Sequence, residues 1–411
     1  MSVRRGSSGI GVAVASAVVL TLGTGCTCGA SEVPIVEGSA EALAPGETAA
    51  PGASSGSGDS VDDAPTQAAA PDPDPRRIAA LVATRPPATV HRCDETVVVA
   101  MSDGRVGALA RDEDTLTLDI WTSMAPPARF ISCVGDAVVF VDTGDTRVVI
   151  RDVATRRDVG STTVEGRVVD VHAGPDAGDL WAIVRGEEDT RAVLFDATSP
   201  TLDARGSLAL GPTPIGFVSV DGTSGDEALL VPDFRGRRVD ALTIGAAGEP
   251  VTQTHEVPVR PVGLVVVDGV ARLRSMNGTE APVVASDERA DASWPWPVSL
   301  ALETPSGLWI HGSSTARLAR VAADTLTVEA ELEGLPDVVE LVALDPYVVA
   351  VRAGQDPALV FIDGATATIA AVASLDTAPS GAIALDDGIA VLLPESNRVE
   401  LWSRPDGSDA P

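Results

Sequence analysis

Short apolar segments return along this chain at a spacing of about 42 residues. In each round an apolar segment leads into Asp-x-x-Thr, or a degraded form of it, and then into a second segment rich in β-branched residues. The anchor positions are Asp112, Asp152, Asp196, Gly245, Asp287, Ala322 and Asp363, spaced 35 to 49 residues apart. Long stretches with a 3.6-residue period are lacking, so the repeat predicts strands and no long helix.

A β-repeat of this length is typical of a propeller whose blades are four-stranded sheets. We count eight segments suited to innermost strands and eight suited to second strands, which predicts eight blades. The eighth blade has Arg398–Ser403 as its third strand and no room for a fourth, whereas Ile78–Ala83 is a strand without a blade. Pairing of these two ends would close the ring. The irregular region between Gly245 and Ala322 leaves seven blades as the alternative.

The Asp-x-x-Thr element has a mechanical role in this interpretation. Its carboxylate accepts hydrogen bonds from backbone amides two and three residues further on, which closes a tight turn between outer strands. The pattern Val/Leu/Phe-x-Asp-x-x-Thr, over residues 78–404, resembles the bacterial YVTN-type repeat propellers. It is also similar to the quinoprotein-type repeat, although only the round from Asp112 to Trp121 has the Trp and none has the Gly of that motif. The resemblance implies an architecture and no particular activity.

Composition excludes several classes of function. The chain has 59 acidic residues against 29 basic ones, a formal charge of −30, and all of its basic residues are Arg. Such a charge repels nucleic acid, and the absence of Lys excludes a Walker-type phosphate loop and Schiff-base chemistry. No hydrolase, metalloprotease or dinucleotide-binding motif is found, so we expect no catalytic, cofactor-binding or metal site.

The first 25 residues are interpreted as a signal peptide of the lipoprotein type. Arg4 and Arg5 precede an apolar stretch from Ile10 to Leu22 that is too short to span a bilayer. The following Gly-Thr-Gly-Cys resembles a lipobox and makes Cys26 the expected lipidation site, although the large aliphatic residue lies one position early. The alternative is a conventional signal peptide cleaved near Ala30, with Cys26 removed.

Residues 26–75 have the composition of a disordered acidic tether, rich in Ala, Gly, Ser and Pro and without Arg. A glycosylated tract is the alternative. We therefore divide the chain into the signal peptide (1–25), the tether (26–75), the propeller (76–405) and a short tail (406–411). An exported, membrane-anchored protein that faces the periplasm or the exterior follows from this division.

Cys93 and Cys133 would occupy equivalent inner strands of the first two blades. In an exported protein this pairing suggests a disulfide, although two buried free thiols would suit the same positions. His91 and His172 also fall on inner strands, where we interpret them as isolated structural histidines rather than metal ligands.

Two groups of Trp are expected. Trp residues inside strands should pack between blades. Trp294 and Trp296 alternate with Pro in the irregular region, where they could form an exposed docking patch; the alternative is that they fill space within an imperfect blade.

Two functions remain open. The favoured one is a non-catalytic, lipid-anchored binding or scaffolding propeller of the cell envelope, monomeric and with a protein partner. The alternative is an extracytoplasmic enzyme of lactonase-like or oxidoreductase type, with acids and His91 or His172 at the channel mouth. The scarcity of His, Tyr and Lys argues against the enzyme, because general acid–base catalysis uses these groups.

Overall fold

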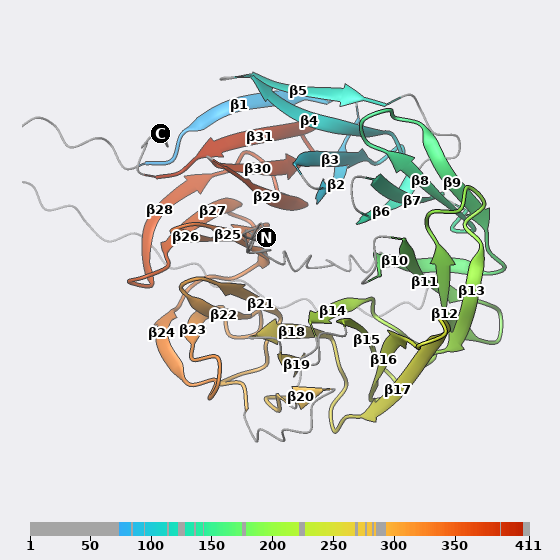
Figure 1. Cartoon of the computed structure of the whole chain (residues 1–411). Coiled ribbons are helices and arrows are strands. Elements are labelled where there is room, and N and C mark those ends of the chain that lie inside the picture. Colours follow the sequence, from blue (N-terminus) through green and yellow to red (C-terminus); the bar gives the residue numbers. More distant parts are fainter. Residues whose placement is uncertain are drawn as a thin grey trace, which may run out of the picture. The chain divides into compact units, whose positions relative to one another are not determined.

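The computed structural model describes residues 74–405 except for short gaps at 84, 94, 113–114, 122–127, 135–136, 143, 175–177, 222–226, 268–269, 276–277, 282, 285–292 and 387. The expected signal peptide, Cys26, nearly all of the expected tether and the tail lie outside the described residues. Regular structure in the described part consists of β-strands, which form eight antiparallel sheets around a common centre (Figure 1). The all-β propeller fold is confirmed. Within this part, no helix has the length and apolar character needed to cross a membrane.

Each sheet is one blade, and its strands follow one another from the centre outward. The strands of blades 1 to 4 are β2 (Pro87–Cys93), β3 (Thr96–Met101), β4 (Val106–Asp112), β5 (Thr115–Ile120), β6 (Ala128–Val134), β7 (Ala137–Asp142), β8 (Arg147–Asp152), β9 (Asp158–Thr163), β10 (Arg167–Ala173), β11 (Asp179–Arg185), β12 (Thr190–Asp196), β13 (Ala204–Ala209), β14 (Val218–Asp221), β15 (Glu227–Asp233), β16 (Arg238–Ile244) and β17 (Pro250–Glu256).

Blades 5 to 8 contain the remaining strands. These are β18 (Gly263–Val267), β19 (Val270–Arg274), β20 (Val283–Val284), β21 (Leu300–Thr304), β22 (Gly307–Gly312), β23 (Arg317–Val321), β24 (Val328–Leu332), β25 (Val338–Leu344), β26 (Tyr347–Arg352), β27 (Ala358–Asp363), β28 (Thr368–Ser374), β29 (Gly381–Leu385), β30 (Gly388–Leu393), β31 (Arg398–Ser403) and β1 (Arg77–Val82).

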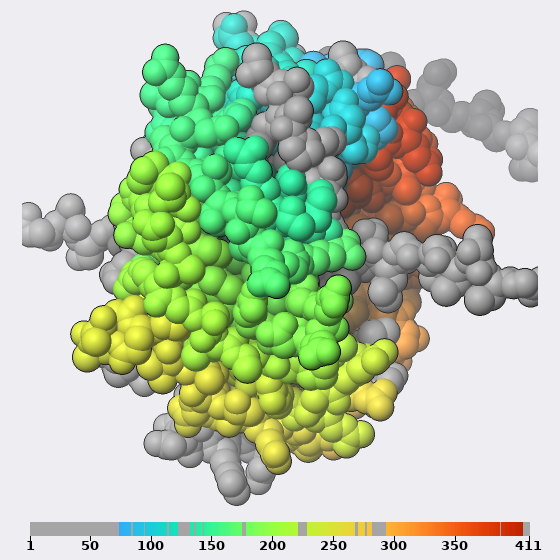
Figure 2. All heavy atoms as spheres, turned by 90° about the vertical axis from the view of Figure 1, so that its right-hand side faces the viewer, coloured from blue at the N-terminus to red at the C-terminus, as the bar shows by residue number. Residues whose placement is uncertain are grey.

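The core lies between the blades. Second strands such as β11 and β30 are apolar at most positions and buried on both faces, because each face of a blade packs against a neighbouring sheet. Eight apolar clusters result, one at each junction between consecutive blades. Figure 2 shows the neighbouring green and yellow blades in contact along the right-hand side of Figure 1. Trp181 on β11 and Trp309 on β22 belong to two of these clusters, as expected for Trp inside strands, and Trp121, which directly follows β5, belongs to a third.

The aspartate turns have the predicted hydrogen bonds. Asp363, at the end of β27, accepts from the backbone amides of Ala365 at 3.0 Å and Thr366 at 2.7 Å. These bonds and the Thr366 hydroxyl stabilise the charged carboxylate and lower the pKa of Asp363. Asp152 accepts from the amide of Thr155 at 2.6 Å in the matching turn of blade 2. Both turns join the third strand of a blade to its fourth strand.

The ring closes as the sequence predicted. β1 is the outermost strand of blade 8 and pairs antiparallel with β31, from Arg77 opposite Trp402 to Val82 opposite Arg398. The Arg77 guanidinium donates to Glu400 at 3.0 Å, and the Glu400 side chain is almost fully buried. A backbone bond from Ala83 to Asn397, at 2.7 Å, continues the pairing beyond the strand. The two ends of the described chain are therefore joined in one sheet.

Blade 5 is the imperfect blade. Three of its strands lie within the described residues, and the outermost of them is described only over Val283–Val284, so the eighth blade expected from the repeat is present but less regular than the others. Trp294 and Trp296 are buried, with 1 % and 7 % of their surface exposed, in the cluster between blades 5 and 6. The expectation of an exposed docking patch at these rings is wrong. They occupy apolar space beside the shortened blade instead.

Cys93 on β2 and Cys133 on β6 are joined by a disulfide, with their α-carbons 5.4 Å apart. The bond is possible because both residues lie near the same end of neighbouring inner strands. It links blade 1 to blade 2 by a covalent bond.

Ring closure gives the first prediction. A chain that begins at residue 84 lacks β1 and should melt at a temperature on the order of 10 °C lower than a chain that begins at residue 74, because the apolar cluster between blades 8 and 1 is exposed. Differential scanning calorimetry of both chains measures the difference. Equal melting temperatures would mean that β1 does not hold the ring closed.

Candidate binding site

The histidines do not form a common site. His172 on β10 has its Nδ1 2.5 Å from the Ala173 carbonyl oxygen, and its ring is tilted against Phe217 with centroids 6.0 Å apart. Burial lowers the pKa of His91 on β2. His311 is fully buried and bonded through both ring nitrogens, to Ser299 Oγ at 3.2 Å and to the Leu335 carbonyl at 2.9 Å. These contacts are those of isolated structural histidines.

Two acidic side chains on inner strands connect consecutive blades. Asp170 of β10 accepts from the Phe217 amide, next to β14, at 2.9 Å. Glu340 of β25 accepts from the Ala382 amide in β29 at 2.8 Å. Each acid is the first residue after a β-bulge in the pairing of the first strand with the second. The two acids therefore occupy equivalent positions in blades 3 and 7.

Burial has a strong effect on both carboxyl groups. It raises the pKa of Glu340 to about 7, against the opposing effect of the Ala382 hydrogen bond. It also raises the pKa of Asp170, although the amides of Phe217 and Val171 and the nearby His172 favour the charged form. Because both carboxylates bond to backbone amides, they serve to join blades. Over the described residues, no three His, Cys, Asp or Glu side chains are grouped as metal ligands.

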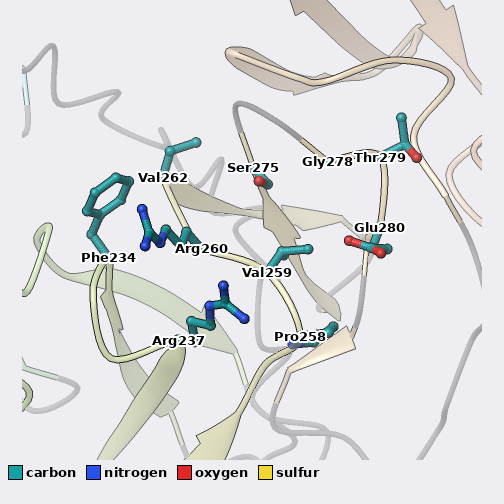
Figure 3. Close-up of a pocket in the computed structure, with 10 residues that line it drawn as sticks. All are labelled: Phe234, Arg237, Pro258, Val259, Arg260, Val262, Ser275, Gly278, Thr279 and Glu280. Atoms are coloured by element: carbon teal, nitrogen blue, oxygen red, sulfur yellow. The ribbon is translucent and has the colours of Figure 1, made fainter.

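A pocket of about 630 Å³ lies where blade 4 meets the imperfect blade 5 (Figure 3). Phe234 and Arg237 come from the turn between β15 and β16, and residues 258–262 come from the link between β17 and β18. Ser275 and residues 278–280, which follow β19, complete it. A volume of this size accommodates a small organic ligand or a short peptide.

The turn that carries Phe234 and Arg237 is another aspartate turn. Asp233 accepts from the amides of Arg235 at 3.0 Å and Gly236 at 2.8 Å, and from the Thr213 hydroxyl at 2.7 Å. Burial opposes the charged form of Asp233, but these hydrogen bonds outweigh it and lower the pKa. The backbone carbonyl of Arg237 also accepts from the Val257 amide at 2.8 Å. The turn is thus held in place against the link between the blades.

One side of the pocket is cationic. The Arg260 guanidinium lies over the Phe234 ring, 5.9 Å from its centroid, and 38 % of the Phe234 surface is exposed. Figure 3 shows the Arg237 side chain pointing into the same space. Within the described part of the chain, no carboxylate forms an ion pair with Arg237 or Arg260. No described acidic side chain therefore pairs with these two guanidinium groups, although the chain has a net charge of −30.

The other side of the pocket is formed by residues with side-chain oxygen atoms and by small residues. A Cβ atom placed on Gly278 would lie 3.2 Å from Glu280 Oε2, 3.3 Å from Val259 Cγ1 and 3.5 Å from Ser275 Oγ. These three side chains therefore converge on Gly278. Glu280 is exposed, whereas Ser275 is buried.

The buried Trp294 fixes this second side. Its indole nitrogen donates to the Leu273 carbonyl at 2.8 Å, and its backbone amide donates to the Thr279 carbonyl at 2.6 Å. Glu280 pairs with Ser293 as an isolated bridge. Trp294 thus has a structural role: it holds the wall of the pocket and is not among the residues that line it.

Sequence reasoning missed the pocket, because its residues are contributed by three separate segments and none belongs to a motif with a known chemistry. Two weak signals were available in the sequence. One is the Asp-x-x-Gly turn at Asp233, which carries Phe234 and Arg237, and the other is the irregular spacing of the blade that follows.

Comparison with known proteins supports the fold alone. No family model matches the chain, and no curated protein matches it. Solved structures do match, among them the computationally designed Ika8 protein, with a TM-score of 0.64 and 12 % identity over 80 % of this chain and 99 % of that one. Sqt1 from Saccharomyces cerevisiae matches with a TM-score of 0.62 and 10 % identity, over 80 % and 99 % of the two chains. BamB from Moraxella catarrhalis matches with a TM-score of 0.57 and 12 % identity, over 80 % and 97 %.

The buried acid of blade 7 makes stability depend on pH. The pKa of Glu340 is about 7 in the folded protein and 4.5 ordinarily, so the folded state holds the proton more tightly. Its contribution is complete below pH 4.5 and is lost as the pH rises through 7. In the unchanged protein, Glu340 should lower the free energy of unfolding by about 1–3 kcal/mol as the pH rises over this range. The variant Glu340→Gln should not show this decrease.

Urea unfolding at a series of pH values measures this difference. Glu256→Gln, at an exposed position of β17 without a described partner, is the matched control and should leave the pH dependence unchanged. If the Glu340→Gln profile is parallel to that of the unchanged protein, Glu340 does not titrate in this range.

Proposed function

We propose that this chain is a non-catalytic binding module of the cell envelope, of the YVTN-like class of propellers, that holds a ligand or protein partner at the pocket between blades 4 and 5. The observation that carries the proposal is the pair of guanidinium groups, Arg237 and Arg260, that face a concave site without an acidic partner from the described residues. Ion-paired arginines are common on an acidic surface, whereas two unpaired ones beside an exposed aromatic ring are typical of a recognition site.

The fold is consistent with this role. A propeller similar to BamB and to other solved propellers fits a protein-binding scaffold in general. The acids on the inner strands support a structural interior, since Asp170 and Glu340 are bonded to backbone amides of the next blade. General acid–base catalysis requires an ionisable group directed at a substrate, whereas these carboxylates accept hydrogen bonds from the fold itself.

Lipid anchoring through Cys26 belongs to the same proposal. With acyl chains on Cys26 and the acidic segment 26–75 as a spacer, the ring would be held at a membrane surface. Each buried methylene contributes about 0.8 kcal/mol to membrane affinity, so two or three chains make the attachment durable.

Anchoring is tested by Cys26→Ser in the full chain expressed in a bacterial host. The unchanged protein should partition into the detergent phase on Triton X-114 extraction, and the variant should remain in the aqueous phase. Cys28→Ser is the control and should behave as the unchanged protein does. Equal partitioning of all three would exclude Cys26 as the anchor.

Binding is tested with the isolated propeller, residues 74–411, as bait for a solubilised envelope extract of the native host. A partner retained by the unchanged propeller should be lost with the Arg237→Gln/Arg260→Gln double variant. Arg235→Gln removes one charge from the same turn without changing a residue that lines the pocket, and it should retain the partner. A partner held equally by all three proteins would place recognition elsewhere on the ring.

A further inference from the structure

The pocket has opposite charges on its two sides. Arg237 and Arg260 lie toward Phe234, and Glu280 lies beyond Val259 in the view of Figure 3. Among the described residues, Glu280 forms an ion pair with neither arginine, although all three line the same cavity. With respect to the described residues, both the cationic and the anionic groups can therefore meet a ligand.

The remaining surface of the pocket is apolar or uncharged. Pro258, Val259 and Val262 lie between the two charged sides, and the exposed Phe234 ring extends this apolar surface beneath Arg260. Beside Glu280, the absence of a side chain at Gly278 leaves space for the polar end of a ligand. A complementary ligand has an anionic end, an apolar middle and a cationic end.

The charges of the pocket and of the whole chain further restrict the class of ligand. A phosphate-rich or polycarboxylate ligand would be repelled by Glu280 and by the net charge of −30. A simple monoanion would satisfy the arginines and leave Glu280 without a partner. A zwitterion has no net charge, so it is not repelled at long range, and it satisfies both sides at contact. A planar carboxylate also suits two guanidinium groups, which bind carboxylates through paired hydrogen bonds.

We propose that the pocket binds a short peptide with free ends. Its terminal carboxylate is held by Arg237 and Arg260, its terminal ammonium is held by Glu280, and an apolar side chain lies against Pro258, Val259 and Val262. The cavity of about 630 Å³ is large enough for two or three residues. This inference rests on the proposed binding function and specifies its ligand class.

The test uses isothermal titration calorimetry of the full propeller with the tripeptide Ala-Leu-Ala at neutral pH. Three forms are compared: free ends, an amidated carboxyl end and an acetylated amino end. The free peptide should bind with one-to-one stoichiometry, and each cap should weaken binding about tenfold or more, since each removes one charge-assisted contact.

Two single variants then assign the ends. In Arg260→Gln, amidation should cost far less than in the unchanged protein, whereas acetylation should keep its full effect. In Glu280→Gln the pattern should be reversed, because each variant removes the partner of one end. Unchanged melting temperatures confirm that both variants are folded.

Three results would overturn the inference: no binding of the free peptide, equal binding of all three forms, or sensitivity to one end alone. The outcome is separate from that of the extract experiment. A captured partner with no peptide binding refutes the peptide ligand and leaves the binding module in place. Failure of both experiments refutes both proposals.

Discussion

The burial of both faces of every blade is the constraint on which the rest of the structure depends. A sheet whose second strand is apolar on both faces, as in β11 and β30, cannot stand alone in water. It needs a neighbour on each side, and a row of such sheets has two unsatisfied ends unless it closes. The pairing of β1 with β31 resolves this, because it completes blade 8 and lets the cluster between blades 8 and 1 form. β1, the first strand of the described chain, is therefore required to complete blade 8, which contains the last strands.

The candidate site is found where this regularity is incomplete. In a regular blade a fourth strand covers the outside, whereas the described residues of blade 5 form three strands, of which β20 is the outermost. The segment that includes Thr279 and Glu280 is instead held by Trp294, through one bond from its indole and one from its backbone. This arrangement leaves a concave space toward blade 4, into which an Arg and an aromatic ring project from a well-ordered turn. Departures from local regularity are often where function is located, because they are retained although they do not serve the fold.

The sequence predicts the fold well and the site poorly, and the physical reasons differ. Strand positions follow from short apolar segments and turn residues, which are local signals, and the period fixes how many sheets must stack. Closure by residues 77–82 could be predicted because an unpaired strand at one end and a missing strand at the other complement each other. The burial of Trp294 and Trp296 could not be predicted, since a Trp-Pro alternation has no period that distinguishes a buried face from an open one. Phe234, Arg260 and Glu280 are brought together by the packing of two blades, which no local pattern encodes.

The two partly buried acids, Asp170 and Glu340, show how one local irregularity can be used for long-range contacts. A bulge adds one residue to an inner strand and changes the direction of the side chain that follows it. The same bulge recurs in blades 1, 2, 3 and 7, and the residues that follow it are Thr89, Phe130, Asp170 and Glu340. Where that residue is an acid, its carboxylate reaches a backbone amide of the next blade and bonds a group that the short inner strands would otherwise leave without a partner. The cost is a carboxyl group held away from water, which the raised pKa of Glu340 reflects. Two acids therefore lose part of their hydration and form direct polar links between blades that are otherwise held together by apolar contact. The strength of these links depends on the protonation state of the two carboxyl groups.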